Sequence, residues 1–271
     1  MTTDKAEIKT IGVLTSGGDS PGMNAAVRAV VRVAVKQGLK VFGIRHGYHG
    51  LLTDQVKPMK NNSVSNIIRS PEGRIVAAET IKKYGIDALI TIGGDGTFTG
   101  AEIFSKEHGV KVIGIPATID NDIFGTDETI GYDTALNTAL DAIDKIRDTA
   151  DAHERMFLVE VMGRDAGFIA LETGIAGGAE LSLLPEEFTN INDIKSQLKN
   201  MLKNQVRSSL VVVAEGDETG GAIKLAELIR EDFKQYDMRV CILGHIQRGG
   251  SPTARDRVLA SRLGAAAIKI L

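Results

Sequence analysis

The stretch Ile11-Gly-Val-Leu-Thr-Ser-Gly-Gly-Asp-Ser-Pro-Gly-Met-Asn24 leads from a short apolar run through a glycine-rich turn into an amphipathic segment. Its first four residues have the length and composition of a strand that is buried on both faces. Gly17 and Gly18 allow the backbone to turn sharply, and the pattern over 24–37 predicts a helix directly after the turn. This order of strand, turn and helix is typical of α/β proteins.

The same alternation continues along the chain. Further apolar runs of about strand length are Val41–Ile44, Ala88–Ile92, Val112–Ile115, Phe157–Val161, Leu181–Leu184, Leu210–Ala214 and Val240–Leu243. Helical patterns lie between several of these runs, over 73–84, 97–107, 134–150, 191–204 and 221–236. Because most of the runs are apolar on consecutive residues, we expect an α/β fold with a mainly parallel sheet and helices on both faces.

The composition excludes several classes of protein. The chain has 271 residues, of which 43% are hydrophobic and 25% are charged, as in ordinary globular proteins. Its net charge of −3 provides no general cationic field for nucleic acid or for an anionic membrane. No apolar stretch is long enough to span a membrane. The single cysteine, Cys241, lies in an apolar run, so we expect a packed thiol and a reducing, cytoplasmic environment.

Glycine-rich turns follow two of the strands in the first half of the chain. Thr15–Asn24 follows the first apolar run and could bind phosphate, or it could be only a tight turn between a strand and a helix. Gly93-Gly-Asp-Gly-Thr97 has more glycine than a helix cap requires, which favours close approach of phosphate oxygens. The carboxylate of Asp95 would repel a polyphosphate, so the partner that suits it at such a site is Mg²⁺. Alternatively, Asp95 or Thr97 simply caps the helix.

Two carboxylates follow the next strand, in Pro116-Ala-Thr-Ile-Asp-Asn-Asp122. Asp120 and Asp122 are two residues apart, so on an extended or turn backbone their side chains can face the same way. One of them could then accept a proton from an alcohol, while the other orients a substrate or metal-bound water. The alternative is an Asx-type turn in a solvated loop.

The ends of three later strands also carry charged groups. In Met162-Gly-Arg-Asp-Ala-Gly167, Gly163 gives the backbone conformational freedom and Arg164 supplies a guanidinium that suits phosphate. The alternative is that Arg164 is an ordinary surface arginine. Glu215 ends a strand where a carboxylate could accept hydrogen bonds from sugar hydroxyls. His245 and Arg248 lie three residues apart and suit a phosphate dianion, although a lone histidine is more often a satisfied polar residue.

Together these segments resemble the phosphofructokinase family, specifically its bacterial ATP-dependent 6-phosphofructokinases. The resemblance covers essentially the whole chain and is based on five motifs in the order of the family: Gly12–Asn24, Gly93–Thr97, Pro116–Asp122, Glu160–Arg164 and Leu243–Pro252. The second motif alone is shared with NAD kinases and lipid kinases. The rival interpretation, that the chain is a kinase of one of those families, does not explain Met162–Gly167 and His245–Ser251.

The resemblance implies a fold and an activity. It implies two doubly wound, Rossmann-like domains with the active site in the cleft between them: an ATP-binding domain of 1–130 plus 246–271, and a fructose 6-phosphate-binding domain of 131–245. It implies phosphorylation of fructose 6-phosphate at the 1-hydroxyl in glycolysis, with Mg²⁺ and with ATP as co-substrate. It also implies a cytoplasmic homotetramer whose active sites are shared between subunits, without nucleic acid or membrane partners.

The resemblance also implies roles for individual residues. Asp120 would be the general base, and Arg164 and Thr118 would stabilise the transferring phosphoryl group. Asp95 and Asp122 would serve the Mg²⁺ environment. The nucleotide would be lined by Gly18, Gly94, Asp95, Gly96 and Thr97. The sugar phosphate would be held by Met162, Gly163, Glu215, His245 and Arg248, with Arg155 and Arg239 reaching a neighbouring subunit's site.

The phosphate donor is predicted from two small residues. Pyrophosphate-dependent relatives carry aspartate where this chain has Gly96 and lysine where it has Ala117. The small residues leave space for a nucleotide, which favours ATP. A pyrophosphate-dependent enzyme and a non-catalytic sugar-phosphate-binding paralogue remain the alternatives.

Three departures from the family pattern accompany the resemblance. Between Ser63 and Arg74 the family carries about fifteen more residues, and we expect a segment missing from this chain rather than a true deletion. The family also continues beyond Leu271, so we expect its C-terminal region to be absent here. The family's effector site would be formed here by Arg28, Arg32, Arg147 and Glu180. Three further positions of that site that are usually basic in the family hold Gln55, Val206 and Ser208 in this chain, which puts effector control in question.

Overall fold

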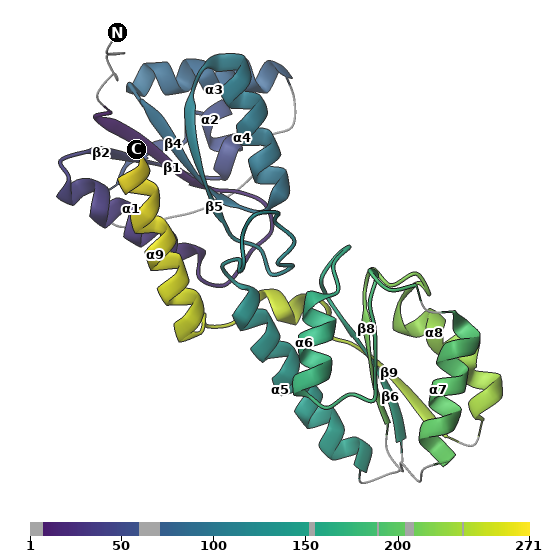
Figure 1. Ribbon diagram of the computed structural model, residues 1–271. Helices are drawn as coiled ribbons and strands as arrows, with labels where there is room; N and C mark the ends of the chain where they lie inside the picture. Colours follow the sequence, from purple (N-terminus) through teal and green to yellow (C-terminus); the bar gives the residue numbers. More distant parts are fainter. Residues whose placement is uncertain (1–7, 60–70, 152–154, 189, 204–208, 235) are drawn as a thin grey trace. The chain divides into compact units, whose positions relative to one another are not determined.

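A computed structural model describes residues 8–59, 71–151, 155–188, 190–203, 209–234 and 236–271 (Figure 1). The chain divides into two compact units, each with its own sheet and core. The first unit comprises Met1–Thr118, Ile123–Gly131 and Pro252–Leu271, and the second comprises Ile119–Asp122 and Tyr132–Ser251. The segment between Ser63 and Arg74, where the family pattern is interrupted, falls mostly on 60–70 and so lies outside the described residues.

The first unit contains a sheet of five strands in the order β3-β2-β1-β4-β5. Its strands are β1 (Thr10–Thr15), β2 (Lys40–Ile44), β3 (Val56–Pro58), β4 (Ala88–Gly93) and β5 (Lys111–Pro116). Its helices are α1 (Met23–Lys36), α2 (Gly47–Leu52), α3 (Pro71–Tyr84), α4 (Asp95–His108) and α9 (Ala254–Ile270). All neighbouring strands are parallel except β3, which runs antiparallel to β2 at the edge of the sheet.

Helices cover both faces of this first sheet. On one face α1 and α9 pack through small and branched apolar side chains against the strands. Gly264 lets these two helices approach closely, because a Cβ atom there would lie 2.8 Å from the carbonyl oxygen of Ala26. On the other face the buried cluster includes Phe42, Tyr48 and Phe104, with side chains from α2, α3 and α4. Burial on both faces explains why the strands are apolar on consecutive residues.

The second unit contains a wholly parallel sheet of four strands in the order β7-β8-β6-β9. Its strands are β6 (Arg155–Val161), β7 (Leu181–Leu183), β8 (Ser209–Ala214) and β9 (Asp237–Ile242). Its helices are α5 (Tyr132–Asp151), α6 (Phe168–Ala176), α7 (Ile191–Lys203) and α8 (Gly221–Ile229), with the 3₁₀ helices η1 (Arg230–Phe233) and η2 (Gly244–Arg248).

Alternate residues of the second sheet face two separate helical layers. Val159 and Val212 lie in a buried cluster with residues of α5 and α6. Leu158, Val211 and Val213 lie in another cluster, with residues of α7 and α8. This alternation follows from the two-residue repeat of a β-strand, and it places a core on each side of the sheet.

The predicted α/β class with mainly parallel sheets is confirmed, and two element boundaries are corrected. The helix predicted over 221–236 ends as an α-helix at Ile229 and continues as η1. The strand predicted over Val240–Leu243 begins earlier, at Asp237, and ends at Ile242. Among the helices of the described ranges, none is long and apolar enough to cross a membrane.

Candidate active site

The carboxyl ends of β1, β4 and β5 lie side by side in the first sheet. The last pair of the β4–β5 ladder is Gly93 with Pro116. The ladder continues beyond the strands, since Ser16 N donates to Ile92 O at 3.0 Å and Ala117 N donates to Gly93 O at 2.9 Å. Three loops therefore leave the sheet at one edge, which is where parallel sheets bind their ligands.

These loops approach one another where glycine leaves space. A Cβ atom at Gly17 would lie 3.2 Å from Thr97 Oγ1, and one at Gly94 would lie 3.5 Å from Thr118 Cβ. At Gly93 no side chain fits at all, because its Cβ would lie 2.3 Å from Thr97 Oγ1. The structure thus brings together Gly94, Thr97 and Thr118, which the sequence predicted as ligand-binding residues.

Helix α4 begins directly after the middle loop, so its first backbone N–H groups are presented at this edge. The N-terminus of a helix carries a partial positive charge and unpaired donors, both of which suit phosphate. Asp95 and Gly96 are exposed in the first turn, while Thr97 is buried. Within the described residues, the Thr97 hydroxyl oxygen has no hydrogen-bond partner. Such a group can be satisfied by a ligand oxygen that enters the loop.

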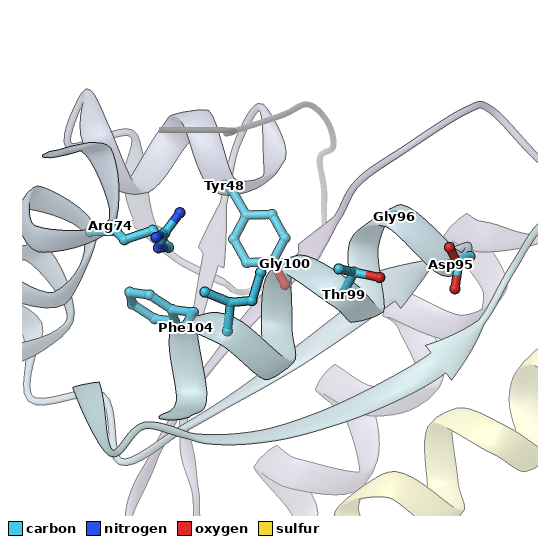
Figure 2. Close-up of a pocket in the computed structure, with 9 residues that line it drawn as sticks. Tyr48, Arg74, Asp95, Gly96, Thr99, Gly100 and Phe104 are labelled. Atoms are coloured by element: carbon cyan, nitrogen blue, oxygen red, sulfur yellow. The ribbon is translucent and has the colours of Figure 1, made fainter. Parts of the chain in front are cut away.

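A pocket of about 350 Å³ extends from this point along helix α4 (Figure 2). The pocket is lined by Tyr48, Arg74, Ala77, Asp95, Gly96, Thr99, Gly100, Ile103 and Phe104. Asp95 and Gly96 lie at one end, and Arg74 and Phe104 lie at the other. The helix between Asp95 and Phe104 covers about 13 Å at its normal rise. This shape suits an elongated ligand with phosphate at one end and a flat ring at the other.

Tyr48 lines the same pocket and is anchored to α4. Its hydroxyl donates to the carbonyl oxygen of Thr97 at 3.0 Å. A Cβ atom at Gly100 would lie 3.6 Å from the Tyr48 ring, so the glycine gives the ring room beside the helix. Burial raises the pKa of the Tyr48 hydroxyl, which therefore stays protonated as a donor.

The two carboxylates predicted after β5 lie in different environments. Asp120 is only 6% exposed, whereas Asp122 is exposed. Between them Asn121 has a φ of 55°, in the left-handed region, so the backbone turns at this residue. Just before them, the carbonyl oxygen of Thr118 accepts a hydrogen bond from Thr129 Oγ1 at 2.7 Å. A buried carboxylate and an exposed one suit different tasks, as an acid–base group and as a solvated ligand respectively.

A second cluster forms where β6 and β8 end, in the second unit. Glu215 Oε1 accepts hydrogen bonds from Arg164 N at 2.7 Å and from Gly163 N at 3.3 Å. Both donors have positive φ, 57° at Arg164 and 151° at Gly163, and a Cβ at Gly163 would lie 2.4 Å from Ala166 O. Glu215, predicted to accept from sugar hydroxyls, therefore also stabilises a strained turn that exposes the Arg164 side chain.

The loop after β9 joins this cluster through a buried amide. The Gln247 side chain in η2 accepts a hydrogen bond from Met162 N at 3.3 Å and donates to Gly244 O at 3.1 Å. Gln247 is fully buried, while His245 is exposed and Arg248 is half-buried on the same short helix. The predicted residues Met162, Gly163, Arg164 and Glu215 thus lie beside the loop that carries His245 and Arg248.

Residues 10–271 match the sequence model of the family described as phosphofructokinase. The chain belongs to the phosphofructokinase family. ATP-dependent 6-phosphofructokinase 2 of Bacteroides thetaiotaomicron is 57% identical over 96% of this chain and 85% of its own length. ATP-dependent 6-phosphofructokinase 1 of Thermus thermophilus is 53% identical over 97% of this chain and 86% of its own length.

Solved structures of other phosphofructokinases have the same fold. A chain of the Saccharomyces cerevisiae phosphofructokinase superposes with a TM-score of 0.90 at 33% identity, covering 96% of this chain and 41% of the yeast chain. The pyrophosphate-dependent phosphofructokinase from Marinobacter aquaeolei superposes with a TM-score of 0.82 at 23% identity, covering 97% of this chain and 76% of its own. At that lower identity the likeness concerns the fold alone.

Two of the predicted sugar-phosphate residues lie away from the others. Arg155 Nε donates to Asp237 Oδ2 at 2.8 Å, and Arg239 Nε lies 2.9 Å from Asp237 Oδ1. These hydrogen bonds, from Arg239 first and Arg155 second, hold the pKa of Asp237 below its usual range. Because Arg155 begins β6 and Arg164 follows its end, the length of the strand separates them by about 20 Å. One chain therefore does not bring these arginines to its own Arg164.

The predicted effector residues are divided between the two units. Arg28 and Arg32 are exposed on α1 in the first unit. In the second unit, Arg147 Nη2 lies 3.7 Å from Glu180 Oε1 and also donates to Gly178 O. Gln55 is exposed next to β3, whereas Val206 and Ser208 lie outside the described residues.

Several residues of the pocket and of the second cluster were not predicted from the sequence, among them Tyr48, Gln247 and Arg74. Tyr48 follows the end of β2, a strand parallel to β1, so its position at a strand end was the available signal. Gln247 lies between the predicted His245 and Arg248. Arg74 had no local signal, because it reaches the pocket from α3 only through the packing of α3 beside α4.

Proposed function

We propose that the chain transfers the γ-phosphoryl group of ATP to the 1-hydroxyl of D-fructose 6-phosphate, giving fructose 1,6-bisphosphate and ADP in the cytoplasm. The observation that carries this proposal is the identity of 57% and 53% with two ATP-dependent 6-phosphofructokinases over nearly the whole chain. The clusters at the strand ends of the two sheets support it, because they supply the groups that phosphoryl transfer requires.

In this proposal the first unit binds ATP. The triphosphate lies against Gly18 and the loop Gly94–Thr97, where glycine permits close approach and α4 presents its first N–H groups. The adenosine occupies the pocket along α4. A Cβ atom at Gly96 would meet nothing within 4 Å, so the space that aspartate fills in pyrophosphate-dependent relatives stays open for a nucleotide.

The carboxylate of Asp95 would hold Mg²⁺ at this end of the pocket. Asp95 is exposed in the first turn of α4, beside the glycine loop, so its carboxylate oxygens would be available to a hard divalent cation. Asp122, which is also exposed, would serve the same environment through water. When bound, Mg²⁺ neutralises charge on the phosphate oxygens. The residues of the chain supply the remaining steps.

Asp120 would accept the proton of the sugar 1-hydroxyl as it attacks phosphorus. An alcohol is a poor nucleophile at neutral pH, so a positioned base is needed, and the low exposure of Asp120 keeps bulk water from competing. Thr118 lies beside the glycine loop and would donate to the migrating phosphoryl group. Arg164 would contribute its positive charge as the bond to ADP breaks.

The sugar phosphate would be bound by the second unit. Met162, Gly163 and Glu215 would contact the sugar, and His245 and Arg248 would bind its phosphate. Arg155 and Arg239 would complete the site of a neighbouring copy, which implies a homotetramer. An exposed apolar row on α6, formed by Phe168, Leu171 and Ile175, supports association, since such a row is normally covered.

The proposal is tested by supplying fructose 6-phosphate with either ATP or pyrophosphate in a coupled assay. Turnover with ATP is expected, and turnover with pyrophosphate alone would contradict the proposed donor. Binding of fructose 6-phosphate without turnover would instead indicate a non-catalytic paralogue. Light scattering during gel filtration would measure the oligomeric state in the same preparation.

A further inference from the structure

An ion pair lies at the apolar end of the pocket along α4. Arg74 of α3 donates to Glu107 of α4 through two nitrogens, with Nε 2.6 Å from Oε2 and Nη2 2.8 Å from Oε1. The Arg74 side chain is 21% exposed and the Glu107 side chain 42% exposed. The hydrogen bonds from Arg74 hold the pKa of Glu107 below its usual range, so its carboxylate is charged at neutral pH. Arg74 lines the pocket, while Glu107 does not.

The two-nitrogen contact controls both the orientation and the charge of Arg74. A guanidinium that forms two parallel hydrogen bonds to one carboxylate is held in a fixed plane. The adjacent negative charge also cancels most of the field that a lone arginine would exert on a phosphate. The opposite end of the pocket differs, because there the N-terminus of α4 attracts anions.

Aromatic side chains beside Arg74 make this end suitable for a flat ring. Tyr48 and Phe104 line the pocket near Arg74 (Figure 2). The Phe104 ring is packed against His108 at a centroid distance of 5.2 Å, which supports it from outside the pocket. Arginine planes and aromatic rings are the usual surfaces on which nucleobases stack.

We propose that Glu107 is a positioning residue for nucleotide binding: it holds Arg74 as a flat, charge-compensated surface on which the base stacks, and so directs the triphosphate to the other end of the pocket. Glu107 does not touch the nucleotide and acts only through Arg74. This inference rests on the proposed function, because it assumes that the pocket takes a nucleotide.

The test is a double-mutant cycle with Glu107→Gln and Arg74→Gln. The dissociation constant is measured by calorimetry with the non-hydrolysable ATP analogue AMP-PNP, and KM for ATP is measured in the coupled assay. We expect about a 5-fold increase in both constants for Glu107→Gln and about 10-fold for Arg74→Gln, because part of the base stacking is lost. The double variant should match Arg74→Gln, since Glu107 has nothing to position once Arg74 is gone.

A matched control lies on the same helix. Glu102 pairs with Lys106 on the exposed side of α4, and neither residue lines the pocket. Glu102→Gln should leave both nucleotide constants unchanged. In Glu107→Gln, the KM for fructose 6-phosphate and kcat should also stay within about 2-fold of the parent value, which separates nucleotide positioning from a general loss of structure.

The outcomes distinguish this inference from the proposed function. Independent effects that multiply to about 50-fold in the double variant would overturn the inference, as would unchanged nucleotide constants in Glu107→Gln. If the parent protein binds AMP-PNP but does not phosphorylate fructose 6-phosphate, the proposed function fails while the binding cycle still tests Glu107. If the parent protein does not bind AMP-PNP, both are overturned.

Discussion

The strand ends of the two sheets use the same architectural position in different ways. In the first unit, the loops after β1, β4 and β5 meet where Gly17, Gly93 and Gly94 lack side chains. In the second unit, the loops after β6, β8 and β9 are joined by side chains, with Glu215 and Gln247 accepting from backbone N–H groups.

This difference indicates two modes of recognition within one α/β design. A loop of backbone N–H groups can surround a polyphosphate closely and without side-chain specificity. Side chains held by buried hydrogen bonds can instead distinguish hydroxyls and a single phosphate group in fixed positions. We therefore expect substitutions of the glycines at the ends of β1 and β4 to act by steric crowding, and substitutions in the loops after β6, β8 and β9 to act through lost hydrogen bonds.

The largest effect is expected at Asp120, which follows β5 in sequence and belongs to the second unit. Asp120→Asn keeps the size of the side chain but removes the base, so kcat should fall by about 10³-fold while fructose 6-phosphate still binds. Asp144→Asn, on the exposed side of α5, is the control. Near-parental turnover of Asp120→Asn, measured by the coupled assay, would exclude Asp120 as the base.

A large effect on stability is expected at Gly93. In Gly93→Ala the new methyl group would lie 2.3 Å from Thr97 Oγ1 and 2.4 Å from Ser16 O, so the loops must separate. The free energy of unfolding in urea should fall by about 3 kcal/mol. Gly96→Ala is the matched control, because its methyl group would meet nothing within 4 Å. Equal stability of the two variants would show that the loops at the ends of β1 and β4 can accommodate a side chain at Gly93.

A smaller effect is expected at Glu215 in the second cluster. Glu215→Ala removes the acceptor for Gly163 N and Arg164 N, so KM for fructose 6-phosphate should rise about 10-fold while KM for ATP stays unchanged. Glu215→Gln should be milder, since an amide oxygen still accepts both hydrogen bonds. Equal losses in the two variants would indicate that the negative charge, rather than the hydrogen bonds, is what matters.

The smallest effect concerns Cys241, which lies within β9 and not at its end. Burial raises the pKa of the Cys241 thiol, so less thiolate is present at pH 7 than in an exposed cysteine. Alkylation by iodoacetamide should therefore be about 5-fold slower than that of glutathione, and it should accelerate as the pH is raised. Alkylation faster than that of glutathione would show that the Cys241 thiol is activated by its surroundings, as the polar groups at the strand ends could do, and is not simply buried.

The elements that sequence reasoning identified are those whose burial leaves a regular pattern. The central strands β4 and β8 are buried at every residue, so their consecutive apolar residues stand out. Helix α6 was not identified, because Phe168, Leu171 and Ile175 are exposed and the segment has no polar face. The helix over 221–236 was extended too far, since buried Ile229 and Phe233 continue the helical spacing into η1.

The candidate site was predictable where its residues are local in sequence. Glycine and charged residues directly after a strand show both their position and their chemistry, as in Gly93–Thr97 and Met162–Gly167. Tyr48 and Arg74 reach the pocket only because α2, α3 and α4 pack on one face of the sheet. The approach of Tyr48 and Arg74 to the pocket depends on tertiary packing, which no short sequence motif encodes.

The ladder that extends past β1, β4 and β5 has a consequence for binding entropy. The amide hydrogens of Ser16 and Ala117 are bonded to carbonyl oxygens of β4, so they should exchange with solvent only when the sheet itself opens. The loops that meet the ligand are then ordered before it arrives. Little conformational entropy is lost on binding, so more of the contact energy remains as affinity.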